Sequence, residues 1–170
     1  MPLTRKDFKK IIALTENLDI LEADNELVYL RLKAQTETGI DGGFYSDFFQ
    51  WMTERDFSDF HRKFSETCLD FFKDDIFFEN KIKPAVELKL AVKKREWGNA
   101  YKSAKRILSE QSFINSKLLS DAGKAFLFGS KDFEENAIFF RNLEKYYSKT
   151  DLFYIYFYTA RLMDKNSQVQ

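Results

Sequence analysis

The sequence is poor in the residues that build metal sites and disulfides. Its 170 residues include one histidine, His61, and one cysteine, Cys68. A single cysteine excludes an intramolecular disulfide, and a single histidine excludes three-histidine zinc sites and di-iron sites built on two Glu-x-x-His motifs. On one helix the two residues would be about 10 Å apart, too far for a Cys–His nucleophilic pair. Cys68 is therefore expected in the core, and we expect no catalytic residue, metal or cofactor.

Proline and glycine are also scarce, at 2 and 6 residues. Strand-rich domains need turn residues about every eight to twelve positions, so this scarcity favours helices. Aromatic side chains, by contrast, are abundant: there are 19 Phe and 8 Tyr. Each can bury roughly 150–250 Å², enough to fill the spaces between packed helices. The composition predicts an all-α fold.

Long apolar runs are missing as well. A membrane-spanning helix needs ~20 apolar residues, and the nearest candidate covers only 152–158. The first seven residues lack the apolar core of a signal peptide. Lys+Arg and Asp+Glu both number 27, so no net field draws the protein to nucleic acid or anionic lipid. We expect a cytoplasmic protein with no membrane partner.

Apolar spacing and capping residues predict about nine helices in one domain, 1–170. The expected helices cover about 4–18, 25–38, 44–53, 56–72, 84–94, 96–110, 115–128, 132–147 and 151–164. They divide into N-terminal helices in 1–40, three helical hairpins in 44–147 and a closing helix at 151–164. Two arrangements fit this pattern: hairpins stacked as a short solenoid, and an irregular helical bundle.

A basic–acidic–aromatic triplet recurs at three expected helix starts. The copies are Arg55-Asp56-Phe57, Arg95-Glu96-Trp97 and Lys131-Asp132-Phe133, with the aromatic residues 40 and 36 positions apart. An acidic residue in the first turn is stabilised by the helix dipole. Positions three, seven and ten after the aromatic residue continue the same face. This face is expected to pack on the preceding helix.

The triplet resembles the start of the second helix of a tetratricopeptide repeat. The clearest match is 96–100 followed by Ala104, and the next is 132–133 preceded by Leu118, Ala122-Gly123 and Phe126. The resemblance covers roughly 44–164 and is most specific over 84–147. Basic residues replace the family's turn glycine in all three copies, and Phe60 and Asn136 replace the small residue expected three positions after the aromatic one.

The resemblance implies a concave face lined by the first helix of each hairpin, which would hold a partner segment. Counting back from the three aromatic residues nominates Tyr45, Phe49, Met52, Lys89, Val92, Lys93, Lys124 and Phe128. Such a face, aromatic at one end and basic at the other, suits an acidic, partly apolar peptide. The leading hypothesis is a non-enzymatic adaptor or chaperone-like module for protein–protein interaction.

Two other features lead to alternative functions. The hairpin at 81–106 is basic and could bind nucleic acid; its positive residues are Lys81, Lys83, Lys89, Lys93, Lys94, Arg95, Lys102, Lys105 and Arg106. The simpler interpretation is a solvated basic face. The closing helix is crowded with aromatic residues, of which Tyr154 and Tyr158 are candidates for a homodimer or self-assembly interface.

Overall fold

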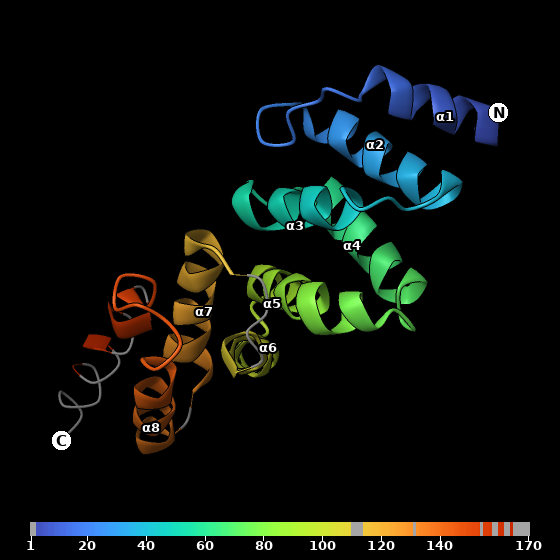
Figure 1. Ribbon diagram of the computed structural model, residues 1–170. Coiled ribbons are helices and arrows are strands. Elements are labelled where there is room, and N and C mark those ends of the chain that lie inside the picture. Colours follow the sequence, from blue (N-terminus) through green and yellow to red (C-terminus); the bar gives the residue numbers. More distant parts are fainter. Residues whose placement is uncertain are drawn as a thin grey trace. The chain divides into compact units, whose positions relative to one another are not determined.

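The computed structural model describes residues 3–109, 114–130, 132–153, 155–157, 160–161 and 164, apart from the side chains of 133 and 135 (Figure 1). Within these ranges all regular structure is helical and no strand occurs. The predicted all-α fold is confirmed. The chain divides into two compact units, Met1–Asp75 and Ile76–Gln170. The predicted division into one domain with three hairpins stays a prediction.

The first unit contains α1 (Arg5–Leu14), α2 (Asn25–Thr38), α3 (Phe44–Glu54) and α4 (Asp59–Phe71). Helix α2 packs on the other three. The core between them is largely aromatic; for example, Phe48 of α3 meets Phe64 of α4 edge-on, with ring centroids 5.5 Å apart. This packing uses the phenylalanine-rich composition, since edge-to-face pairs add to the free energy of simple burial.

Side-chain caps set the helix starts in the first unit. Thr4 and Asp7 form a capping box at α1, and the Asp24 carboxylate caps α2. The Asp41 carboxylate accepts hydrogen bonds from the backbone of Gly43 and Phe44 at 3.0 and 3.1 Å, just before α3. The predicted starts of these three helices are confirmed. An N-terminal side chain that accepts such bonds satisfies otherwise unpaired helix N–H groups.

Helix α4 begins at Asp59, three residues later than predicted, because Ser58 and His61 form the capping box. The Ser58 N–H donates to Nδ1 of His61 at 3.1 Å, and Nε2 lies 3.1 Å from the Trp51 carbonyl oxygen. An N–H can only donate and a carbonyl can only accept, so the proton is on Nε2. His61 is fully buried and stacks on Trp51. It therefore has a structural role.

Cys68 is also buried, as predicted, at 1% exposure. Burial raises the pKa of its thiol well above the usual range, because a thiolate is poorly solvated in the core. The thiol therefore stays protonated at neutral pH and is a weak nucleophile.

The second unit contains the π-helix η1 (Phe78–Ile82), followed by α5 (Lys83–Lys94), α6 (Trp97–Ser109), α7 (Ser116–Gly129) and α8 (Phe133–Leu143). Helices α5, α6 and α7 each contact the other two. Phe126 of α7 packs on Phe140 of α8 with ring centroids 4.9 Å apart. The described residues at 153, 155–157, 160–161 and 164, in the predicted closing helix, are helical.

The π-helix was not predicted. Its last turn is closed by the Lys83 N–H, which donates to the Phe78 carbonyl five residues earlier. Pro84 follows directly and has no N–H to continue an α-helical ladder. The wider π turn therefore lies directly before the residue that cannot donate a backbone hydrogen bond.

The turn between α5 and α6 is a Schellman motif with arginine in the position that favours glycine. The Arg95 N–H donates to Val92 and the Glu96 N–H donates to Ala91, at 3.1 and 2.8 Å. Arg95 has φ 58° and ψ 30°, in the left-handed region. Arg55, in the first triplet, is extended at φ −98° and ψ 162°. Two similar triplets therefore form different turns; Lys131, in the third, lies outside the described residues.

Replacing Arg95 with glycine should stabilise the second unit. Removal of the left-handed strain is expected to raise its free energy of unfolding by about 1 kcal/mol. The control is Arg55→Gly, which removes hydrogen bonds to the carbonyl oxygens of Ile20 and Ala23 and should destabilise the first unit. Urea unfolding read by pulsed hydrogen exchange measures each unit separately. A destabilising Arg95→Gly substitution would contradict the strain argument.

Gly129 allows α7 and α6 to meet at their backbones. A Cβ atom there would lie 2.8 Å from Cβ of Tyr101 and clash with the Trp97 carbonyl group. Because the clash is with backbone and with an atom next to backbone, no side-chain rotation relieves it. The two helices would have to move apart.

Gly129→Ala is therefore expected to lower the free energy of unfolding of the second unit by about 1–3 kcal/mol through overpacking. Gly98→Ala, in α6, is the matched control, because a Cβ atom at Gly98 meets nothing within 4 Å. That change should leave stability unchanged or raise it by up to about 1 kcal/mol. Equal effects of the two substitutions in a urea titration would rule out the backbone contact.

Candidate binding face of helices α5 and α7

Three of the nominated partner-binding residues lie on α3, in the first unit. Met52 is 1% exposed, and its sulfur accepts a hydrogen bond from the Ser65 hydroxyl of α4 at 3.0 Å. It is therefore a core residue and offers no surface to a partner, because its face of α3 turns toward α4. Tyr45 and Phe49 are half-buried. The Tyr45 hydroxyl donates to Asp75; burial, with this bond adding to it, raises the pKa of the phenol.

The other five nominated residues lie on α5 and α7, where an ion pair joins the two helices. The ammonium group of Lys89 lies 2.6 Å from the Asp121 carboxylate, and both side chains are nearly buried, at 11% and 12% exposure. The ammonium group of Lys124 lies 3.4 Å from the same carboxylate and is 41% exposed. The structure thus brings Lys89 and Lys124 together, with Asp121 between them.

The remaining three nominated residues extend this surface. Val92 and Lys93 follow Lys89 by three and four positions, so they share its face of α5; Val92 is half-buried and Lys93 is exposed. Phe128 shares the face of Lys124 on α7 and is 53% exposed. Its ring lies against Trp97, with centroids 4.8 Å apart. We call this surface the α5/α7 face; it consists of Lys89, Val92, Lys93, Asp121, Lys124 and Phe128.

No protein-family model, curated protein or solved structure matches this chain. A functional assignment therefore depends on the chemistry of the surface itself. Among the described residues, no helix is long and apolar enough to cross a membrane. In the same part of the chain, no three His, Cys, Asp or Glu side chains are grouped so as to hold a metal ion.

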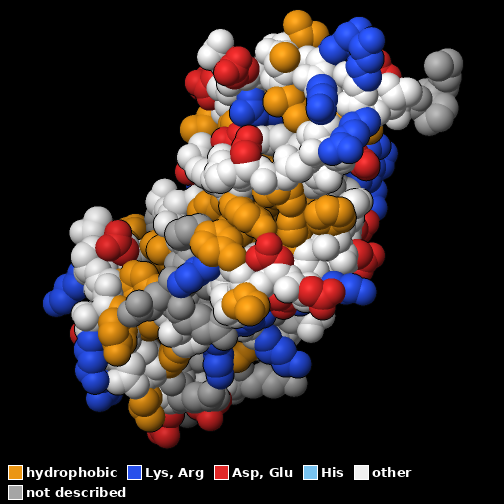
Figure 2. All heavy atoms as spheres, turned by 45° about the vertical axis from the view of Figure 1, so that its right-hand side comes forward, with side chains coloured by type: hydrophobic (Ala, Val, Ile, Leu, Met, Phe, Trp, Pro, Cys, Tyr) orange, Lys and Arg blue, Asp and Glu red, His pale blue; other side chains and the backbone are white. Residues whose placement is uncertain are grey.

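The basic hairpin at 81–106 uses several of its charges internally. Lys83 pairs with Glu79 at 2.8 Å, and the Arg106 guanidinium donates to the Glu79 carbonyl oxygen at 2.9 Å. Lys105 lies 5.1 Å from the centroid of the Tyr101 ring. On the side of the molecule in Figure 2, basic and acidic side chains are interspersed. The internal pairs weaken the field that a phosphate backbone would meet.

Tyr154 and Tyr158, the candidate self-assembly residues, lie outside the described residues. Two neighbours in the closing helix are described. Phe153 and Phe157 stack with centroids 6.3 Å apart and are 58% and 46% exposed. The Arg161 guanidinium lies 5.9 Å from the Phe157 centroid. This part of the helix therefore exposes aromatic surface.

Sequence reasoning missed Asp121 and did not explain Asn136. A signal for Asp121 is present: it is an acidic residue inside the apolar stripe of α7, three positions before Lys124. Asn136 is 2% exposed and accepts a hydrogen bond from the Tyr101 hydroxyl at 2.6 Å, while its amide donates to Ser130. Because both ends of its amide are hydrogen-bonded, Asn136 can be buried at the position, three residues after Phe133, where a small residue was expected.

Lys89→Met should destabilise the second unit by about 2 kcal/mol, because the nearly buried Asp121 carboxylate loses its closest donor while Lys124 compensates only in part. Lys93→Met removes the same charge one turn later from an exposed position and should change stability by less than about 0.5 kcal/mol. Urea unfolding read by pulsed hydrogen exchange gives both values. If Lys89→Met and Lys93→Met have the same free energy of unfolding, Lys89 is a surface residue in solution.

Proposed function

We propose that the α5/α7 face binds an acidic, partly apolar segment of another protein, and that the chain is a non-enzymatic adaptor or chaperone-like module. The observation that carries this proposal is the meeting of Lys89 and Lys124 at one carboxylate. It brings nominated residues of two helices together. Because Lys89 and Asp121 neutralise each other, the exposed Lys93 and the partly exposed Lys124 make this face basic.

The surface offers the two kinds of contact that such a partner needs. The exposed Lys93 and partly exposed Lys124 can pair with carboxylates of the segment, and charges at the rim of an interface mainly steer association and give specificity. Phe128, half exposed beside Trp97, supplies an apolar anchor. Aromatic anchors usually contribute most of the binding free energy.

The arrangement of the second unit supports a tetratricopeptide-like organisation of 84–147. Mutual contacts among α5, α6 and α7 are those of a helical hairpin followed by the first helix of the next one. The left-handed backbone at Arg95 matches the place of the family's turn glycine. The proposal also places the protein in the cytoplasm, where an unpaired cysteine such as Cys68 is common.

The test compares Lys93→Glu/Lys124→Glu with Lys63→Glu/Lys73→Glu. The first pair changes the α5/α7 face. The second makes the same charge change at exposed lysines of the first unit. An array of seven-residue peptides containing Asp or Glu and one aromatic residue serves as the probe. We expect the first variant to lose at least about tenfold in affinity and the second to bind as the wild type does.

Equal losses in the two variants would mean that only net charge matters, and the α5/α7 face would be excluded as a specific site. A parallel pull-down from lysate, with and without nuclease, tests the alternative at 81–106. If every captured partner disappears after nuclease treatment, nucleic-acid binding replaces this proposal. If the chain captures only itself, self-assembly through the closing helix replaces it.

A further inference from the structure

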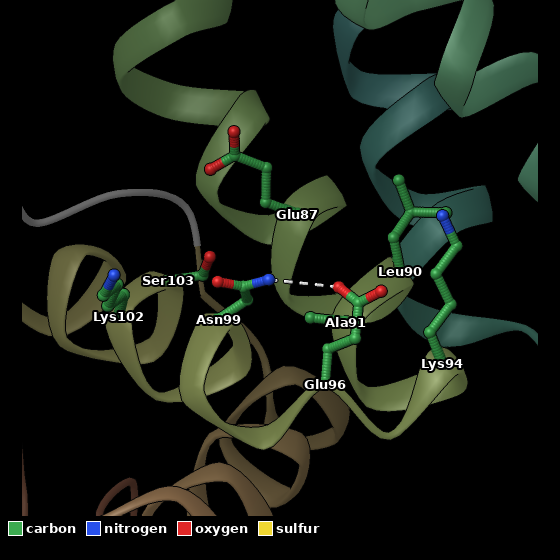
Figure 3. A pocket seen from close by; sticks show the side chains of 8 residues that line it. All are labelled: Glu87, Leu90, Ala91, Lys94, Glu96, Asn99, Lys102 and Ser103. Atoms are coloured by element: carbon green, nitrogen blue, oxygen red, sulfur yellow. Dashed lines mark hydrogen bonds between the residues drawn. The ribbon is translucent and has the colours of Figure 1, made fainter.

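A pocket of about 370 Å³ lies between α5 and α6. The residues of α5 that line it, Glu87, Leu90, Ala91 and Lys94, are spaced so that they lie on the side of the helix opposite Lys89. Figure 3 shows them around one space with Asn99, Lys102 and Ser103 of α6. The pocket is therefore separate from the α5/α7 face, and its occupancy does not depend on the proposed function.

The pocket combines an apolar wall with charged side chains of both signs. Leu90 and Ala91 are 8% and 5% exposed and form the apolar part. Glu87 and Glu96 contribute negative charge, and Lys94 and Lys102 contribute positive charge, so the formal charge of the lining is zero. The lining is more polar than that of most small-molecule sites, so a ligand that fits it carries charged groups as well as a small apolar part.

The Glu87 carboxylate is half-buried at the pocket and is not engaged by the described part of the chain. It makes no hydrogen bond or ion pair with any described residue. Burial raises the pKa of this carboxyl group, although Lys83 and Arg106 act in the opposite direction. Its oxygen atoms are not among the buried polar atoms that lack a partner, so water can still reach them. A cationic ligand group in the pocket would replace that water and pair with the carboxylate.

Two further polar groups of the pocket are available. The Ser103 hydroxyl is on a side chain only 8% exposed, and it has no hydrogen-bond partner within the described ranges. Lys102 is exposed and, among those same residues, makes no ion pair. Glu96 is different, because its carboxylate accepts a hydrogen bond from the Asn99 amide at 3.1 Å, drawn as the dashed line in Figure 3.

We propose that this pocket binds an aliphatic α-amino acid as a zwitterion. The ammonium group of the ligand pairs with the Glu87 carboxylate and donates to the Ser103 hydroxyl. Its carboxylate pairs with Lys102, and its side chain packs on Leu90 and Ala91. A zwitterion matches a lining whose own charges cancel, whereas a simple cation or anion leaves one sign of the lining unpaired.

The probe is L-leucine, compared with two analogues that each lack one charge. 4-Methylpentanoate keeps the carboxylate and loses the ammonium group; 3-methylbutylamine keeps the ammonium group and loses the carboxylate. Titration of the ¹⁵N-labelled full chain is followed by NMR. We expect L-leucine to bind with a dissociation constant of about 1 mM and each analogue to bind at least about tenfold more weakly. The perturbed amides should belong to α5 and α6.

Variants assign the two charges of the ligand separately. Glu87→Gln should weaken L-leucine at least about tenfold and erase its advantage over 4-methylpentanoate. Lys102→Gln, at an exposed position, should make L-leucine bind no more tightly than 3-methylbutylamine, and it should not affect folding. Glu134→Gln, exposed on α8, is the matched control and should bind as the wild type does.

The proposal is overturned if L-leucine produces no saturable shifts below about 50 mM, or if either analogue binds as tightly as L-leucine. Shifts that map outside α5 and α6, or equal weakening by Glu87→Gln and Glu134→Gln, overturn it as well. Spectra of the unliganded variants verify that each is folded before titration.

Discussion

The ion pair between Lys89 and Asp121 is the contact on which the arrangement of the second unit depends. Two nearly buried charges 2.6 Å apart are favourable only while they remain together, because either alone would be a poorly solvated charge. The pair therefore restricts the rotation of α5 about its own axis against α7. With Lys89 turned toward α7, Val92 and Lys93 lie on the same side, while Glu87 and Leu90 lie on the side that lines the pocket with α6. The orientation of α5 that keeps this pair together is thus also the one in which Glu87 and Leu90 face the pocket.

Two backbone features complete this arrangement. The left-handed turn at Arg95 ends α5 and leads into α6, and Gly129 lets the end of α7 reach the backbone of α6 at Trp97. The latter contact brings Phe128, the neighbour of Gly129 in sequence, against the Trp97 ring. The apolar anchor of the α5/α7 face is therefore positioned by a glycine that makes no binding contact itself. A substitution that separates α6 from α7 would disturb the anchor together with the stability of the unit.

Much of the fold was predictable because its signals are local. Caps at Thr4, Asp24 and Asn115 gave correct starts for their helices, and proline at 84 marked the start of α5. The start of α4 was missed because the N-cap residue Ser58 has a histidine, His61, as its capping-box partner, where Glu or Gln is usual. The π-helix has no signature comparable to apolar periodicity. At the candidate sites, spacing along each helix indicated which residues share a face, but burial and pairing depend on the neighbouring helix. Met52 and Lys89 were both expected at the surface. Packing against α4 buries Met52, and the ion pair with α7 leaves only 11% of the Lys89 side chain exposed.

A double-mutant cycle on Lys89 and Asp121 tests whether this ion pair holds α5 in place; it uses Lys89→Met, Asp121→Asn and the double variant. Urea unfolding read by pulsed hydrogen exchange gives the stability of the second unit. The pair Lys83–Glu79, 2.8 Å apart but with 26% of each side chain exposed, is the reference. We expect a coupling free energy of at least about 1 kcal/mol for Lys89–Asp121 and about 0.3–0.5 kcal/mol for the reference pair. A Lys89–Asp121 coupling no larger than the reference would contradict this expectation, because α5 would then be held in place by something other than this ion pair.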